Sequence, residues 1–330
     1  KFDGDKAAEA SNAARSAVSA PLLTTLSFDV RTSREDDGFA TLPEEFERAL
    51  RDKRWPQVTD LCVRTVVSPA CIAAVACPKL QSLLLMCAAV PQPEHVRALM
   101  ARHPVLTSLS VSANYIRDES EPTDSKVVSS AAAPSAIEPL VLPHLRELCL
   151  QVANDQLFAG VSLPALTDLR LQGSEVRIDR FDALLPNMPK LELLHISEFA
   201  LVRFSADAKA APSVRSLEYS PRPTAASNLQ AALRAFSNLE SLDIQDAQAE
   251  LASNFLLALS TQPLRALADL DVFAPLSADG LDPVTLAVAL QNCPALCVLG
   301  LYRANADVKL WRMRFGRAQR ANTWRTTAGA

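Results

Sequence analysis

One eight-residue pattern recurs along nearly the whole chain and constrains its fold more than any other feature. The pattern is Pro-x-Leu-x-x-Leu-x-Leu, in which Val, Ile, Phe or Tyr replaces some leucines, and residues 164–171 are a complete copy. Eleven copies occur, and the two at 237–244 and 265–272 lack the proline in register. Successive central leucines lie 21 to 39 residues apart. The central leucines are Leu26, Leu61, Leu83, Leu109, Leu148, Leu169, Leu194, Leu217, Leu242, Leu270 and Leu299.

Each copy predicts a short β-strand, because Leu-x-Leu has the period of a strand with one buried face. The proline should end a preceding helix and impose an extended approach to the strand. One strand with one helix cannot bury its own apolar side, so we expect stacked units with parallel strands and a shared core. Between the copies we expect helices or turns, for example at 93–102, 180–186, 228–236, 253–260 and 283–291.

With these copies the chain resembles a leucine-rich repeat protein over about residues 20–302. The resemblance implies an α/β solenoid with about eleven parallel strands on the concave face and helices and turns on the convex face. In the usual repeat an Asn stands three residues after the last strand leucine, and only Asn114 fits that position here.

In two copies a cysteine directly precedes the proline, in Cys77-Pro-Lys-Leu80 and Cys293-Pro-Ala-Leu296. They resemble the cysteine-containing subtype that is common in F-box proteins, the substrate receptors of ubiquitin ligases. Residues 42–46 begin as an F-box does, but the next strand is expected by Val58, and no F-box is identified. Because the other copies carry mostly apolar residues at the cysteine position, we expect Cys77 and Cys293 to serve packing.

The pattern divides the chain into three parts. Residues 1–20 are expected to be a leader or an N-terminal cap, and residues 21–302 form the solenoid. Insertions interrupt the solenoid at 31–55, where 41–54 should be helical, and at 113–142, where a surface loop is expected. Residues 303–330 form a basic C-terminal cap or tail.

Charge is spread unevenly. The whole chain has a formal net charge of −4, yet residues 303–330 hold seven basic residues and one acidic residue, a net +6, which leaves −10 for the rest. Such asymmetry marks either a solvated end or a segment with its own electrostatic partner. Aromatic residues interleave with arginines in this segment, so Arg312, Arg314, Arg317 and Arg320 are candidate RNA-binding residues.

No motif for catalysis, cofactor binding or metal binding is found. Nucleophile elbows, phosphate loops and dinucleotide fingerprints are missing from the sequence, and its four histidines lack metal-ligand spacing. We therefore expect that the protein is not an enzyme and that it binds neither a cofactor nor a metal ion. The longest apolar run, at 83–90, is too short for a membrane span. Seven cysteines without a C-x-x-C pair favour a reducing intracellular compartment, cytoplasm or nucleus, with an organelle left open because the sequence starts without Met.

The concave face is the expected functional surface, since residues that flank the central leucine, and the residue after the last one, should point away from the core. We expect a non-catalytic scaffold that binds a partner protein there, for which a basic segment is the favoured partner. Two alternatives stay open: a structural subunit of a large assembly such as a ribonucleoprotein, and a substrate-recognition subunit of a ubiquitin ligase. The candidate partner-binding residues are Glu147, Asp168, Arg170, His195, Glu218, Asp243, Gln245, Asp269, Asp271, Phe273 and Tyr302.

Overall fold

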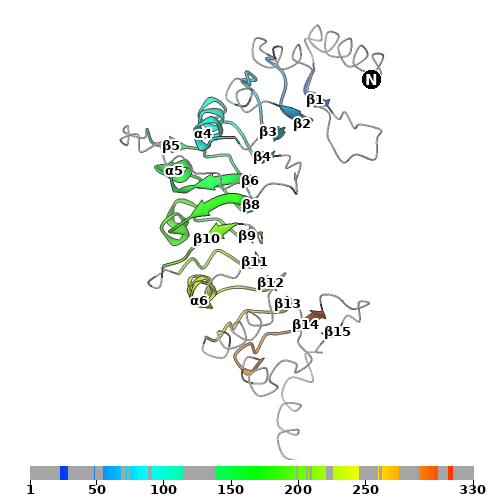
Figure 1. Ribbon diagram of the computed structural model, residues 1–330, viewed down its shortest axis with the longest axis vertical. Helices are drawn as coiled ribbons and strands as arrows, with labels where there is room; N and C mark the ends of the chain where they lie inside the picture. Colours follow the sequence, from blue (N-terminus) through cyan, green and yellow to red (C-terminus); the bar gives the residue numbers. More distant parts are fainter. Residues whose placement is uncertain are drawn as a thin grey trace, which may run out of the picture. The chain divides into compact units, whose positions relative to one another are not determined.

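The computed structural model describes somewhat more than half of the chain, and the chain forms two compact units. Unit 1 comprises Lys1–Val152 and Gln156–Pro164, and unit 2 comprises Ala153–Asp155 and Ala165–Ala330. Figure 1 shows the course of the chain, with helices and strands labelled. The described residues are 23–28, 48, 55–67, 72, 75–87, 91–113, 138–197, 200–205, 207, 210–220, 226–244, 259, 262–274, 288, 290–303 and 311–314.

Unit 1 is built on a parallel sheet in which the strands follow one another in chain order. Helix α4 (Pro93–Arg102) links two of them, and the short helix α5 (Asp155–Phe158) follows the last. A separate pair of parallel strands, β5 (Leu140–Val141) and β7 (Val161–Ser162), lies beside them. The strands of the main sheet are β1 (Thr25–Phe28), β2 (Asp60–Val67), β3 (Ser82–Cys87), β4 (Ser108–Ala113) and β6 (Glu147–Asn154).

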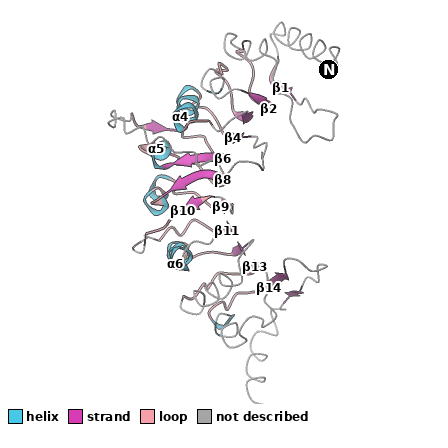
Figure 2. Cartoon of the chain, viewed as in Figure 1, coloured by secondary structure: helices cyan, strands magenta, loops and turns pink. Residues whose placement is uncertain are grey.

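Unit 2 continues the same design and ends with one antiparallel strand, β15 (Trp311–Arg314), paired with β14. Strand β10 (Leu201–Val202) pairs with the far end of β8. Helix α6 (Ala226–Ala235) links β11 to β12, and two 3-10 turns, Phe181–Ala183 and Leu185–Asn187, follow β8. The parallel strands are β8 (Asp168–Ile178), β9 (Leu193–Ile196), β11 (Ser216–Tyr219), β12 (Ser241–Ile244), β13 (Asp269–Ala274) and β14 (Val298–Arg303). In its described part the protein is thus α/β, with extensive parallel strands and few helices (Figure 2).

The central leucines are direct neighbours on adjacent strands. In unit 1 they run in register from Leu26 to Leu148, and in unit 2 from Leu169 to Leu299. None of the eleven is more than 5% exposed, which confirms the expected burial. Within each unit an inner leucine therefore lies between the central leucines of the two neighbouring strands, and together they form one continuous apolar face.

The proline of the pattern occupies a β-turn rather than the approach to the strand. The N–H of Leu80 donates to the carbonyl of Cys77 at 3.1 Å, and the N–H of Leu106 donates to that of His103 at 3.1 Å. Proline then stands second in the turn, where its fixed φ fits. The copy without proline at 237–244 makes the same bond, from Leu239 to Phe236 at 3.3 Å. Proline thus favours the turn without being required for it.

A second hydrogen bond connects each turn to the next strand along the sheet. The carbonyl of Gln81 accepts from Thr107 at 2.7 Å and from Ser108 at 3.0 Å. In unit 2 the carbonyl of Glu192 accepts in the same way from Arg215 and Ser216, both at 2.9 Å. One carbonyl that bridges two consecutive N–H groups fixes the register locally, whatever the length of the chain between the strands.

Polar side chains also hydrogen-bond to backbone groups near the ends of neighbouring strands. The Ser197 hydroxyl accepts the N–H of Gly173 at 3.0 Å, and Oε1 of Gln151 accepts the N–H of Ala113 at 2.7 Å. Asn228 on α6 accepts the N–H of Phe204 at 2.7 Å and donates to the carbonyl of Val202, also at 2.7 Å. Such bonds satisfy backbone groups that would otherwise be buried without partners.

The expected helices agree with the structure to different degrees. Helix α4 has the predicted bounds and buries Val96, Leu99 and Met100, whereas α6 starts two residues earlier than 228 and ends one residue before 236. At 180–186, where a helix or turns are expected, two 3-10 turns form. Most of 253–260 and 283–291, the insertion helix at 41–54, the loop within 113–142 and the termini 1–20 and 315–330 lie outside the described residues.

Candidate functional site

In both units one face of the parallel sheet is buried and the other is open to solvent. The strands β9, β11 and β12 alternate half-buried and buried residues along their length. We call the side away from the buried leucines the outer face. Because the strands are parallel and in register, residues at equivalent positions form straight rows across this face.

The most charged part of the outer face in unit 2 is one row, which we call the charged row. Its members are direct partners on five successive strands, β8, β9, β11, β12 and β13. The row begins with basic residues at its β8 end and carries acidic residues on β11, β12 and β13. Its register then leads through Gly300 on β14 to Arg312 on β15. The charged row consists of Arg170, His195, Glu218, Asp243 and Asp271.

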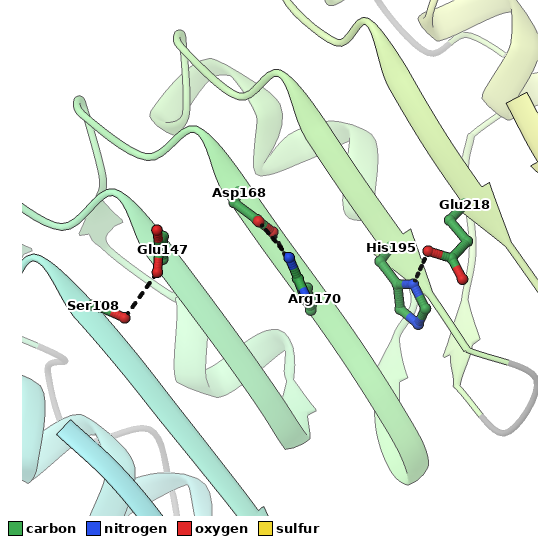
Figure 3. A network of polar contacts seen from close by, with 6 residues as sticks. All are labelled: Ser108, Glu147, Asp168, Arg170, His195 and Glu218. Atoms are coloured by element: carbon green, nitrogen blue, oxygen red, sulfur yellow. Dashed lines mark hydrogen bonds and ion pairs between the residues drawn. The ribbon is translucent and has the colours of Figure 1, made fainter. Parts of the chain in front are cut away.

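Arg170 is held by a carboxylate on its own strand. Its guanidinium donates two hydrogen bonds to Asp168, from Nη2 at 2.9 Å and from Nε at 3.2 Å (Figure 3). Asp168 precedes Arg170 by two residues, so both side chains lie on the same face of β8. The Arg170 side chain is 51% exposed, which leaves the guanidinium accessible to solvent.

The next two members of the row interact with each other. Nδ1 of His195 lies 2.6 Å from Oε2 of Glu218 on the neighbouring strand (Figure 3). The side chains are 17% and 35% exposed, so the pair is partly covered by its neighbours. A carboxylate at Nδ1 fixes the orientation of an imidazole ring and places the proton-bearing nitrogen toward the acid.

Three acidic residues, Glu218, Asp243 and Asp271, then stand on consecutive strands. Adjacent strands are about 4.8 Å apart, and like charges directly opposite each other are unfavourable. Packing of the core does not require this arrangement, since these side chains are on the face away from the leucines. Three carboxylates placed side by side in this way favour a cationic group nearby.

A second row runs beside the charged row and carries shorter side chains. Leu193, Ser216 and Ser241 are register partners on β9, β11 and β12, and all three are half-buried. Asp269 continues this row on β13 and is exposed. We call these four residues the companion row. Its serines leave space beside the longer acidic side chains.

The outer face of unit 1 has a different chemistry. Ser82, Ser108 and Glu147 are partners on β3, β4 and β6, and the Ser108 hydroxyl donates to Oε2 of Glu147 at 3.1 Å (Figure 3). The row beside them contains Leu84 and Ser110. Small and hydroxyl side chains dominate here, so the acidic character of the described outer face is concentrated in unit 2.

The structure places the sequence-predicted residues as follows. Glu147 lies on the outer face of unit 1. Gln245, Arg317 and Arg320 lie outside the described residues. Four more are described only by their strand positions: Phe273 is paired with Tyr302, and Arg312 and Arg314 are paired with Gly300 and Val298. Those on the outer face of unit 2 are Asp168, Arg170, His195, Glu218, Asp243, Asp269 and Asp271.

One class of outer-face position turns out to be structural. The residue that follows the last strand leucine is expected from the sequence to face a partner, but Gln151 and Ser197 bind the backbone of the neighbouring strand instead. Their polar side chains do not distinguish the two roles in the sequence.

The described residues offer little for metal or thiol chemistry. No group of three or more His, Cys, Asp or Glu side chains in the described ranges could hold a metal ion. Burial raises the pKa of the Cys77 and Cys293 thiols to about 11, so both are thiols rather than thiolates at neutral pH. The six cysteines in the described part of the chain have free thiols.

Comparisons with known proteins give no family assignment. No protein-family model matches the chain, and no curated protein matches it. Among the helices that the structure describes, none is long and apolar enough to cross a membrane.

Proposed function

We propose that this chain is a leucine-rich repeat solenoid that acts as a non-catalytic scaffold and binds a partner protein through the outer face of unit 2. The observation that carries the proposal is the charged row, in which five charged or titratable side chains stand in register on the open side of a parallel sheet. The recurring turn and lateral hydrogen bonds support the repeat architecture. Phe273 and Tyr302, paired at the end of β13 and β14, and Asp269 would border the contact.

A basic partner fits this face best. Three acidic residues in succession attract cations over several ångströms, and complementary charge mainly speeds association and selects partners. Because the side chains of His195 and Glu218 are already partly covered, a partner would displace little water from them. The short side chains of the companion row would let the partner approach the sheet closely.

The test is association kinetics with a partner captured from the native source. We expect the double variant Asp243→Lys/Asp271→Lys to slow association by about tenfold or more at low salt, and the difference should shrink as salt screens the charges. The matched control is Glu192→Lys/Asp207→Lys, which makes the same charge change at two exposed positions outside the row. Wild-type kinetics in the row variant would reject the proposal.

Folding of the variants must be shown separately. The row side chains lie away from the buried leucines, so both double variants should keep the far-ultraviolet circular dichroism and cooperative melting of the wild type. RNA recovered in the capture, released by salt and unaffected by the row variant, would favour contact through residues 303–330 instead.

A further inference from the structure

We propose that the partner contacts the charged row through an α-helix that lies across the strands, with an acidic residue opposite Arg170 and one basic residue per turn opposite Glu218, Asp243 and Asp271. This inference rests on the proposed function and adds the form and the charge order of the partner. It follows from the spacing of the strands, the order of charges along the row and the size of the side chains beside it.

The spacing of the acidic residues selects a helix. Strands lie about 4.8 Å apart, so Glu218 and Asp271, two steps apart, are separated by about 10 Å along the row. Two turns of an α-helix rise about 11 Å. An extended segment crossing the same strands places residues on one side about 6.8 Å apart, so three such residues span about 13.5 Å. A polyproline helix repeats about every 9.3 Å, which is about two strands, and so meets alternate acids only.

The order of charges determines which end of the partner helix lies over Arg170. Arg170 stands at the β8 end of the row, two strands before Glu218, and half of its side chain is exposed. A basic residue there would be repelled, whereas an acidic residue would be attracted. The complementary helix therefore carries its acid about two turns from the nearest of three basic residues, on the N-terminal or the C-terminal side. Asp168 already binds Arg170, so this end should contribute less affinity than the acidic end.

The companion row provides room for the helix. Ser216 and Ser241 lie beside Glu218 and Asp243 and are short, so the acidic side chains flank a lower strip of the sheet. Leu193, on β9, adds an apolar contact for a residue on the same helix face. A helix is about 10 Å across with its side chains, which matches the width of two neighbouring rows.

The test uses two synthetic peptides with the whole 330-residue chain. The first is an alanine-rich helix with a glutamate followed two turns later by lysines at i, i+4 and i+7, which lie on one face. The second has the same composition with the lysines at i, i+2 and i+4, on one side only when the peptide is extended. Fluorescence anisotropy measures affinity, and circular dichroism checks the peptide helicity. We expect the first peptide to bind about tenfold more tightly or better.

Row variants connect binding to the proposed site. Asp243→Lys/Asp271→Lys should abolish the preference for the first peptide, whereas Glu192→Lys/Asp207→Lys should keep it. Equal or tighter binding of the second peptide would overturn the helical partner. If neither peptide binds while the captured partner still depends on Asp243 and Asp271, the helix is rejected and the proposed function stands. If Arg317→Gln/Arg320→Gln makes the first peptide bind more tightly, the chain's own basic end competes with it for the charged row. That result would also contradict the proposal of a separate partner.

Discussion

At the scale of single residues, Cys77 and Cys293 show how position determines reactivity. Both are buried before a turn, at 0% and 2% exposure, and burial raises the pKa of each thiol to about 11. We expect a thiol reagent at about pH 8 to label Cys62, Cys149 and Cys297, which are half-buried, well before these two. Mass spectrometry of labelled peptides over time measures the order. Labelling of Cys77 as fast as Cys62 in the folded protein would contradict its burial.

The same shift affects stability at high pH. The unfolded thiol loses its proton near its ordinary pKa of 9.0, whereas the folded thiol of Cys77 keeps it to about pH 11. Between these values the folded state binds more protons than the unfolded state, so its stability falls as the pH rises. The contribution is fully present below the ordinary pKa of the thiol.

A central leucine is the residue whose loss should cost most. Leu194 is fully buried between Leu169 and Leu217 on the neighbouring strands. We expect Leu194→Ala to lower the free energy of unfolding by about 2–5 kcal/mol, because it leaves a cavity bordered by both neighbours. Leu193→Ala, one residue away on the outer face, is the control and should cost less than about 1 kcal/mol. Urea unfolding measures both costs. Similar costs would contradict the assignment of Leu194 to the buried face and Leu193 to the outer face.

At the scale of elements, His103 couples the end of α4 to pH. It is 1% exposed, and its Nε2 lies 3.0 Å from the carbonyl of Val75. Burial, and to a lesser degree the nearby Arg102, lowers the pKa of its imidazole below 6.5, partly offset by the carbonyls of Val75 and Cys77. The unfolded chain therefore binds more protons below about pH 6.5, and stability falls as the pH decreases from there toward the folded pKa.

A substitution separates this effect from general acid sensitivity. His103→Met, which introduces a residue that another copy carries at the same turn position, should lower the melting temperature at about pH 8 but flatten its decline between about pH 6.5 and pH 5. The exposed His144→Gln should leave that decline unchanged. Melting curves across this pH range are the measurement. An equal slope in His103→Met and the wild type would show that His103 does not titrate in this range.

Sequence patterns predicted the strands better than what lies between them. Every strand that contains the pattern has a buried leucine where the pattern places it, because burial of alternate residues requires apolar side chains. Strands β5, β7, β10 and β15 were not predicted, since three are only two residues long and β15 pairs through its backbone with β14. At 180–186 the pattern left helix and turns open, and Pro186, which has no N–H to donate, favours the two short turns that form.

The candidate site was predictable in part for a similar reason. Alternation along a strand assigns Glu218 and Asp243 to the outer face, and equal spacing from the central leucine puts them in one row. Contacts within the face were not predictable, because they depend on rotamers: the Asp168–Arg170 pair runs along a strand, whereas His195–Glu218 runs across two. For the position after the strand, alternation gave no sign that the side chains of Gln151 and Ser197 hydrogen-bond to the backbone of a neighbouring strand.

At the scale of the whole molecule, linker length should matter little for stability. Strands β4 and β6 are held in register by the carbonyl of Thr107, which accepts from Arg146 at 2.8 Å and from Glu147 at 3.1 Å, although 39 residues separate their central leucines. We expect removal of about half of residues 114–137 to change the free energy of unfolding by less than about 1 kcal/mol, since halving a loop changes closure entropy by about 0.6 kcal/mol. Urea unfolding of the shortened chain measures it, and a loss of several kcal/mol would assign this segment a role in the fold.

The shared carbonyl bond has a consequence for how such a molecule can change its length. Within each of the two units, a strand presents two N–H groups to the strand before it and one carbonyl acceptor to the strand after it. A strand that is duplicated or deleted together with its linker would therefore leave neighbours that can still make the same bonds. The carbonyl of Thr167 accepts from Glu192 and Leu193, and removal of residues 192–214 would bring Arg215 and Ser216 to that same acceptor. Such a deletion would shorten the charged row by one member while leaving β8 and β11 intact. In this architecture the number of units therefore determines the length of the charged row.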